Sequence, residues 1–155
     1  MRSASAADID ALVRLNRVVQ KRHSDLQPLD FKAETDDAEV SAFIAALLTT
    51  PKNYLCVADC DGRSSGYIWF EKQDRPETPF TLARKRIYVH HIVVDEAVRR
   101  RGVAPALLRC VEMEALASGV RQIALDVWAE NKMARDFFTS KGFSPFNLRL
   151  RKSLI

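Results

Sequence analysis

The sequence predicts an α/β fold in which a mixed, mostly antiparallel central sheet has helices on both faces. Three observations support this class. Two amphipathic helical segments open the chain, two β-rich runs then flank an Asp-Gly pair, and strand-like and helical runs alternate afterwards. A chain of 155 residues can bury one hydrophobic core, so we expect a single domain over residues 1–155.

Two helices are expected before the first long strand. Residues 5–22 place Ser5 and Asp8 at the spacing of a capping box, with apolar residues following on one helical side. Residues 35–50 repeat apolar residues at i, i+3, i+4, i+7 and i+8 from Val40, and acidic residues crowd their first turn. A loop separates the two helices, and a short strand is the alternative to coil before the first.

Strands and helices alternate in the rest of the chain. The β-rich residues 53–59 and 67–73 flank the Asp-Gly turn, which predicts a hairpin. The further elements expected are a long connection over 75–84, strands over 86–94 and 121–128, helices over 105–119 and 130–142, and a last strand over the alternating residues 143–155.

Composition and charge exclude several classes of protein. No run of about 18 apolar residues exists, so no membrane span is expected. The three cysteines form no Cys-x-x-Cys pair, which argues against a disulfide scaffold or a metal site. Together with an N-terminus that lacks a signal segment, the three cysteines favour a cytoplasmic protein. The net charge of +4 suggests a basic patch that faces an anion, with nucleic acid one candidate.

The segment "VRRRGVAPALL" predicts an anion site. It places Arg99, Arg100 and Arg101 between a strand and Gly102, where a helix begins. The first turn of a helix has unpaired N–H groups and the positive end of the dipole. Glycine lets the backbone approach a ligand closely, and arginines pair with phosphate oxygens. The alternative is that the three arginines are simply solvated.

The same residues resemble a known family. "RRRGVA", with Arg99, Gly102 and Ala104, is similar to the pyrophosphate loop of the GNAT N-acetyltransferase superfamily, and "NKMARDFFTSKGF" resembles that family's second signature. The match covers most of residues 86–143 and implies the GNAT fold and acetyl-CoA (coenzyme A) as cofactor. By this resemblance the pyrophosphate is bound by Arg99, Arg100, Arg101, Gly102, Val103 and Ala104.

The resemblance also implies how the rest of the cofactor is bound. In this family the strand before the loop separates from the next strand, and the pantetheine arm lies between them. The main chain of Ile92, Val93 and Val94 would then hydrogen-bond the arm, and an N–H near Ile92 would polarise the thioester carbonyl. Asn131 would lie near the pantetheine, and Phe138 near the thioester.

Phe138 is a departure from the family pattern. The family often has tyrosine there, positioned to protonate the leaving thiolate, whereas phenylalanine has no proton to give. Its ring can still pack against the thioester region, so cofactor binding survives this change more easily than acid catalysis. The hydroxyls of Thr139 and Ser140 are candidate replacements, and coenzyme A thiolate is a tolerable leaving group without a general acid.

The catalytic base has two candidates. His90 matches a catalytic histidine found in some branches of the family, and an imidazole titrates near neutrality, which suits taking a proton from an ammonium group. Because side chains alternate along a strand, His90 and His91 are expected on opposite faces. Glu71 is the second candidate. The alternatives are a hydrogen-bonded structural histidine and a solvated glutamate.

The function expected is N-acetyltransferase activity. The acetyl group of acetyl-CoA would pass to a primary amine of a small molecule or peptide by direct attack in a ternary complex. The alternative is an acyl-CoA-binding module of the same fold with little activity. Nucleic acid is not expected as a partner, because no stacking aromatics accompany the arginines. Exposed strand edges near the C-terminus favour a homodimer.

Overall fold

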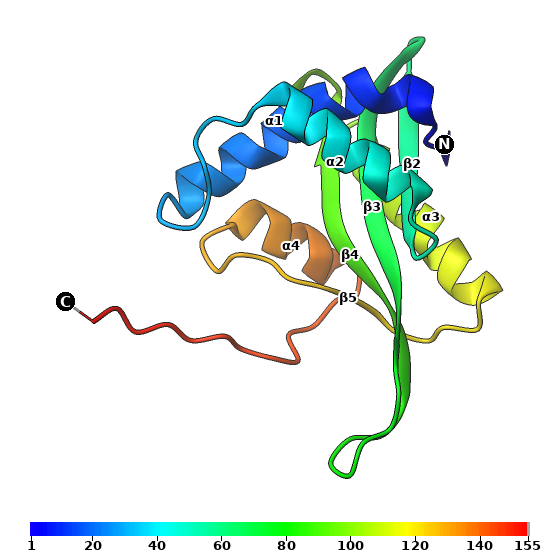
Figure 1. Ribbon diagram of the computed structural model, residues 1–155, viewed down its shortest axis with the longest axis vertical. Coiled ribbons are helices and arrows are strands. Elements are labelled where there is room, and N and C mark those ends of the chain that lie inside the picture. The colour runs from blue at the N-terminus through cyan, green and yellow to red at the C-terminus, as the bar shows by residue number, and fades with distance from the viewer. Residues whose placement is uncertain (155) are drawn as a thin grey trace.

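A five-stranded sheet forms the centre of the computed structural model, which describes residues 1–154 (Figure 1). Its strands, in spatial and chain order, are β1 (Arg2–Ser3), β2 (Asn53–Cys60), β3 (Arg63–Arg75), β4 (Arg84–Val94) and β5 (Ile123–Leu125). The α-helices are α1 (Ile9–Leu26), α2 (Asp37–Thr49), α3 (Val103–Ala117) and α4 (Lys132–Ser140). Neighbouring strands are antiparallel except β4 and β5, which are parallel. The mixed, mostly antiparallel sheet is therefore confirmed.

Helices cover both faces of this sheet, as expected. One core cluster joins α1 and α2 to a sheet face that includes Leu55, Tyr67 and Val93. The other joins α3 to the opposite face, which includes Ile68 and Phe70. Figure 1 shows α1 and α2 in front of the sheet and α3 behind it. Among residues 1–154, no helix is both long and apolar enough to span a bilayer.

The Asp-Gly pair forms the predicted hairpin turn between β2 and β3. Asp61 and Gly62 both have positive φ values, 53° and 77°. A tight turn with two positive φ angles matches the right-handed twist of the strands it connects, and Asp-Gly is a favoured pair for it. Short 3-10 turns, Ala6–Asp8 and Glu96–Val98, precede α1 and α3.

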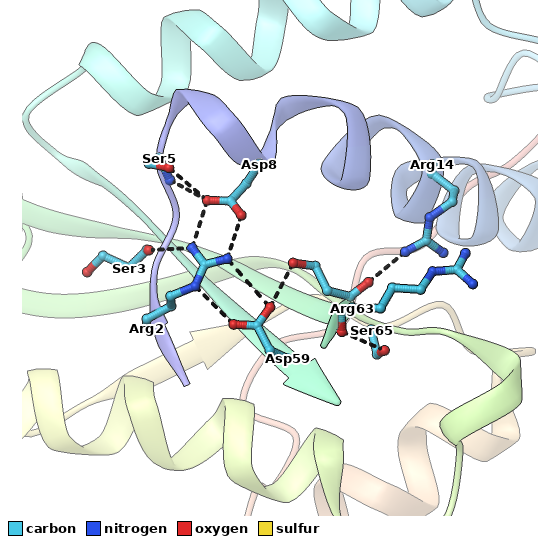
Figure 2. Close-up of polar contacts among 9 residues, drawn as sticks. Arg2, Ser3, Ser5, Asp8, Arg14, Asp59, Arg63 and Ser65 are labelled. Carbon is cyan, nitrogen blue, oxygen red and sulfur yellow. Dashed lines mark hydrogen bonds and ion pairs between the residues drawn. The ribbon is translucent and has the colours of Figure 1, made fainter. Parts of the chain in front are cut away.

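A polar network fixes the N-terminal strand to the sheet, and Figure 2 shows it. The carboxylate of Asp8, which is buried, accepts hydrogen bonds from Ser5 N–H (2.8 Å) and from the guanidinium of Arg2 (2.7 Å). Arg2 also donates to Asp59 at the end of β2 (2.9 Å). Ser5 and Asp8 thus form the capping contact that their spacing predicts, and the Arg2 hydrogen bonds hold the pKa of Asp8 well below its usual range.

The prediction of a last strand over residues 143–155 is wrong for the described residues. Residues 143–154 form no strand and run away from the sheet in Figure 1, with Leu148 and Leu150 exposed. Arg151 ties this tail to the loop after α1 through Asp30 (2.7 Å). Residues 143–154 therefore offer no strand edge to a second copy, and the expected homodimer stays a prediction.

β5 is shorter than the strand expected over 121–128. It pairs with β4 only from Ile87↔Ile123 to Val89↔Leu125. Beyond Val89, β4 continues for five residues beside β3 alone. The two parallel strands therefore separate, which is the arrangement that the family resemblance implies.

A β-bulge at His90 changes the faces of β4. Trp69 lies opposite His91 and Phe70 lies opposite Val89, so His90 is an extra residue in the β4 strand. Two residues of one strand then oppose one of the other, and the alternation of side chains shifts by one position. The rings of both His90 and His91 contact Trp69, at centroid distances of 4.1 and 5.2 Å. The expectation that the two histidines face opposite sides is therefore wrong.

Gly66 allows β3 to pack closely against β4 and α3. A Cβ atom on Gly66 would lie 2.8 Å from the carbonyl oxygen of Val93 and 3.2 and 3.3 Å from side-chain atoms of Val103 and Leu107. We expect Gly66→Val to lower the free energy of unfolding by about 3 kcal/mol, because backbone must move to accept the added atoms. Urea unfolding tests this, with Ser64→Val on the same strand as the control. Equal stability of both variants would contradict the packing.

Candidate active site

The main chain of β4 offers free donors where β5 has ended. The N–H of Asp95 donates to the carbonyl of Ser65 in β3 (2.8 Å). Because N–H directions alternate along a strand, the N–H of Val93 also points toward β3, and those of Ile92 and Val94 point away from it. Two N–H donors therefore face the side that β5 no longer covers.

The loop after β4 ends in a helix start without a side-chain cap. Gly102 is the N-cap residue of α3, with φ of 81°, and no side chain caps the first turn or places an acid there. A Cβ at Gly102 would meet no atom within 4 Å, so space lies open beside it. Pro105 follows in the first turn, where its missing N–H costs nothing. Unpaired N–H groups and the helix dipole favour an anion here.

The arginines of this loop lie around that helix start. Arg99 pairs with Glu96 (3.0 Å), and Arg101 pairs with Asp61 in the β2–β3 turn (3.4 Å). Arg100 has a positive φ of 64°, which is uncommon for a residue with a side chain. Both ion pairs are exposed, so they contribute little to stability and leave the guanidinium groups accessible to another anion.

The two candidate bases form one pair beside the β4 opening, which is the part of β4 from residue 90 to 94 that β5 does not cover. His90 Nε2 lies 3.2 Å from Glu71 Oε2, and both side chains are half-buried. Burial raises the pKa of Glu71, but hydrogen bonds from Gln73 and His90 outweigh it, so the net shift is downward. An ionised carboxylate only accepts hydrogen bonds, so this contact requires a proton on Nε2 of His90, and in the neutral ring the lone pair is then on Nδ1.

His91 has different partners from His90. Its Nδ1 lies 3.1 Å from the hydroxyl of Tyr67, which accepts a hydrogen bond from the amide of Asn16 (3.3 Å). Burial, with smaller effects of His23 and His90, lowers the pKa of His91 to about 4. His91 is therefore neutral near pH 7, and its partners lie on α1 and β3.

Aromatic rings surround the two histidines. Trp69 stacks on His90 and meets His91 edge-on, and its indole N–H donates to Asn53 (2.9 Å), which fixes the ring. Tyr88 lies edge-on to His90 at 4.9 Å. Burial, with the carboxylate of Asp126, raises the pKa of Tyr88 to about 12, so its hydroxyl stays protonated. An uncharged aromatic wall lowers the local dielectric and strengthens the polar contacts within it.

Asn131 lies at the start of α4 and Phe138 lies within it. Asn131 is the N-cap residue, and its side-chain oxygen accepts from the N–H of Ala134 (3.3 Å), which leaves its amide protons available. Phe138 is buried and packs edge-on against Phe143 at 5.4 Å. Ser140 is exposed and donates to its own helix backbone, so the structure does not support it as a replacement acid.

Sequence reasoning missed the residues that orient the two histidines. The sequence indicates Glu71 as an alternative catalytic base to His90 rather than as its hydrogen-bond partner. It gives no reason to single out Tyr67 or Asn16. One signal for the bulge is present: the α3-facing apolar residues of β4 are Ile87 and Val89 before it, and Ile92 and Val94 after it. The spacing of three between Val89 and Ile92 marks a shift in phase.

A sheet that opens between two parallel strands, beside an uncapped helix start, has the architecture of an N-acetyltransferase. The sequence model of the Acetyltransferase (GNAT) family matches residues 19–143. The chain therefore belongs to the GNAT family.

Relatives and solved structures agree with this assignment. The uncharacterized N-acetyltransferase YdgE of Bacillus subtilis is 26% identical over 98 residues, which cover 63% of this chain and 59% of YdgE. Human N-acetyltransferase 8 is 32% identical over 87 residues, 56% of this chain and 37% of that protein. The chain thus matches less than two thirds of the length of either protein.

Two solved structures show the same fold. The BH1408 protein of Bacillus halodurans, solved as a tetramutant, superposes with a TM-score of 0.91 at 22% identity, covering 99% of this chain and 98% of that one. Aminoglycoside N-acetyltransferase AAC(6')-Iy, solved in complex with CoA, gives a TM-score of 0.75 at 18% identity, covering 99% and 92%. At these identities the two comparisons show a shared fold alone.

Proposed function

We propose that this protein transfers the acetyl group of acetyl-CoA to a primary amine by direct attack in a ternary complex. The observation that carries the proposal is the separation of β4 from β5. It leaves main-chain donors of β4 free between an uncapped helix start and the His90–Glu71 pair. Family membership supports acetyl transfer, and the acceptor and its site residues are our inference.

The residues at the β4 opening fit acetyl-CoA. Arg99 to Ala104 would bind its pyrophosphate, because this loop combines guanidinium groups with free N–H groups and open space at Gly102. Val94 would hydrogen-bond the pantetheine arm through its N–H group, with Asn131 adding an amide donor, which leaves the N–H of Ile92 for the thioester. When bound, acetyl-CoA supplies a thioester whose carbonyl carbon accepts a nucleophile.

The His90–Glu71 pair would prepare the amine for attack. Near neutral pH a primary amine is mostly an ammonium ion, which has no lone pair. His90 would take a proton at Nδ1, directly or through water, and the Glu71 carboxylate would stabilise the imidazolium that forms. The N–H of Ile92 would donate to the carbonyl oxygen as negative charge develops there.

Replacing Phe138 with tyrosine tests whether the missing acid limits turnover. We expect Phe138→Tyr to keep the affinity for acetyl-CoA within about threefold, because the added hydroxyl changes one end of a packed ring and at most one hydrogen bond. Turnover should rise or stay unchanged. Isothermal calorimetry and product formation measure the two quantities.

Phe137→Tyr, on the half-buried neighbouring position, is the matched control. A large loss of acetyl-CoA affinity in Phe138→Tyr alone would show that the ring packs directly against cofactor-binding groups and that its proposed place is wrong.

The proposed activity is tested by incubating the protein with acetyl-CoA and a panel of primary amines and detecting acetylated products by mass. A product that appears only with protein and acetyl-CoA supports the proposal. Calorimetric binding of acetyl-CoA without any product across the panel would instead indicate an acyl-CoA-binding module. Absence of binding would contradict both.

A further inference from the structure

The hydrogen bonds of Tyr67 determine which nitrogen of His91 has a proton. Tyr67 is fully enclosed in the core, and its hydroxyl accepts from Asn16 Nδ2 and lies 3.1 Å from His91 Nδ1. If His91 Nδ1 were the donor, the Tyr67 proton would have no acceptor in a buried place, which is costly. Tyr67 therefore donates to Nδ1, and neutral His91 has its proton on Nε2.

The Nε2–H of His91 has no protein acceptor among the described residues. Within residues 1–154, no buried side-chain nitrogen or oxygen lacks a partner, so Nε2 reaches accessible space. The groups that face this ring are His23 from α1, Tyr67 and Trp69 from β3, and His90 from β4. None of them is a carboxylate that could take this hydrogen bond.

The two adjacent histidines thus present opposite hydrogen-bonding groups on the same face. In its neutral form His90, held by Glu71, has a free lone pair at Nδ1, and His91, held by Tyr67, has a free N–H at Nε2. Both rings contact the same indole, Trp69, because the bulge brings them to one side. A ligand that uses both groups needs a proton donor and an oxygen acceptor only a few bonds apart.

We propose that His91 is a specificity-determining residue whose Nε2–H binds a carbonyl or hydroxyl oxygen close to the amino group of the acceptor. This inference rests on the proposed function, in which His90 receives the proton of that amine. The preferred acceptors are then amines with a neighbouring oxygen, such as α-amino amides, rather than simple alkylamines. His91 itself takes no proton in the reaction, because its accessible nitrogen is already protonated.

The tautomer is tested on the free protein. In ¹⁵N-histidine spectra that correlate ring nitrogens with ring protons, His91 should show a protonated Nε2 and an unprotonated Nδ1 at pH 7, with the signals assigned by their loss in His91→Gln. Tyr67→Phe should weaken this preference, since the donor to Nδ1 is lost. A His91 protonated at Nδ1 in the parent protein would overturn the inference without any bearing on activity.

Specificity is tested with phenylalaninamide and 2-phenylethylamine, which differ by a carboxamide beside the amine. The kcat/KM for phenylalaninamide divided by that for 2-phenylethylamine should fall about tenfold in His91→Leu, the size expected for one hydrogen bond. Comparing ratios cancels the different intrinsic reactivities of the amines. His91→Gln, which keeps a side-chain N–H donor, should recover part of the ratio.

The outcomes separate the two proposals. An unchanged ratio in a folded and active His91→Leu variant would overturn the role of His91 and leave the acetyltransferase function intact. If the parent protein acetylates no amine at all, the proposed function fails and the specificity role falls with it. The tautomer of His91 would still be decided by its spectrum.

Discussion

Replacing Gly102 with glutamate is expected to abolish acetyl-CoA binding while the protein stays folded. The new carboxylate would lie at the uncapped start of α3, where an added Cβ meets no atom within 4 Å. It would compete with the pyrophosphate for the same N–H groups and arginines and repel its charge. Affinity should fall at least about 100-fold, the equivalent of two hydrogen bonds to charged groups, as measured by calorimetry.

Gly119→Glu is a matched control for this change. Gly119 follows the other end of α3, has a positive φ of 65° and also has open space beside it. Both variants force a side chain into the left-handed region, at a cost of about 1–2 kcal/mol. Gly119→Glu should therefore reduce stability to a similar extent and leave the affinity unchanged. Unchanged affinity in folded Gly102→Glu would show that the anion binds elsewhere.

Most of the fold follows from local patterns in the sequence. The turn at Asp61-Gly62 and the end of α3 at Gly119 need positive φ angles, which those residue types favour. Asp36 caps α2 by accepting from the N–H of Glu39 (2.9 Å), as the acidic start of that helix suggests. These features depend on neighbours in sequence, so a single chain is enough to predict them.

The C-terminal strand could not be predicted correctly from its alternation. Phe146, Leu148 and Leu150 follow period two, yet all three are exposed in the structure. A strand forms only where a neighbouring strand can take its hydrogen bonds, and that neighbour is not visible in a local pattern. The same reason explains why β5 ends at Leu125 rather than near Trp128.

The sequence predicts where the candidate residues lie in the fold, but not which of their side chains touch. The motif positions Arg99 to Ala104 lie at the start of α3, as expected, and His90 and Glu71, the two candidate bases, are in contact. Their contact depends on the register of β3 against β4 and on the bulge, which are tertiary features. The bulge also brings His91 to the face of His90, so the roles of the two histidines depend on their partners rather than on strand alternation.

Replacing His90 with glutamine is expected to lower kcat by about 10²–10⁴-fold, the usual size of general acid–base catalysis. Glutamine keeps a similar length and a hydrogen-bonding group but cannot accept a proton from an ammonium ion. The fall in activity at acidic pH should also disappear, because that fall reports protonation of the base. Initial rates of amine acetylation across pH measure both effects.

Variants of the neighbours of His90 decide between a base and a structural residue. Glu71→Gln keeps an acceptor for Nε2–H but removes the charge that stabilises the imidazolium, so kcat should fall about tenfold and the acidic limb should persist. His91→Gln should also keep the acidic limb, because His91 is already neutral near pH 7. If His90→Gln keeps the parent rate and Glu71→Gln loses it, Glu71 is the base. If both keep the parent rate and the acidic limb, water takes the proton, and His90 is only a hydrogen-bonded residue of β4.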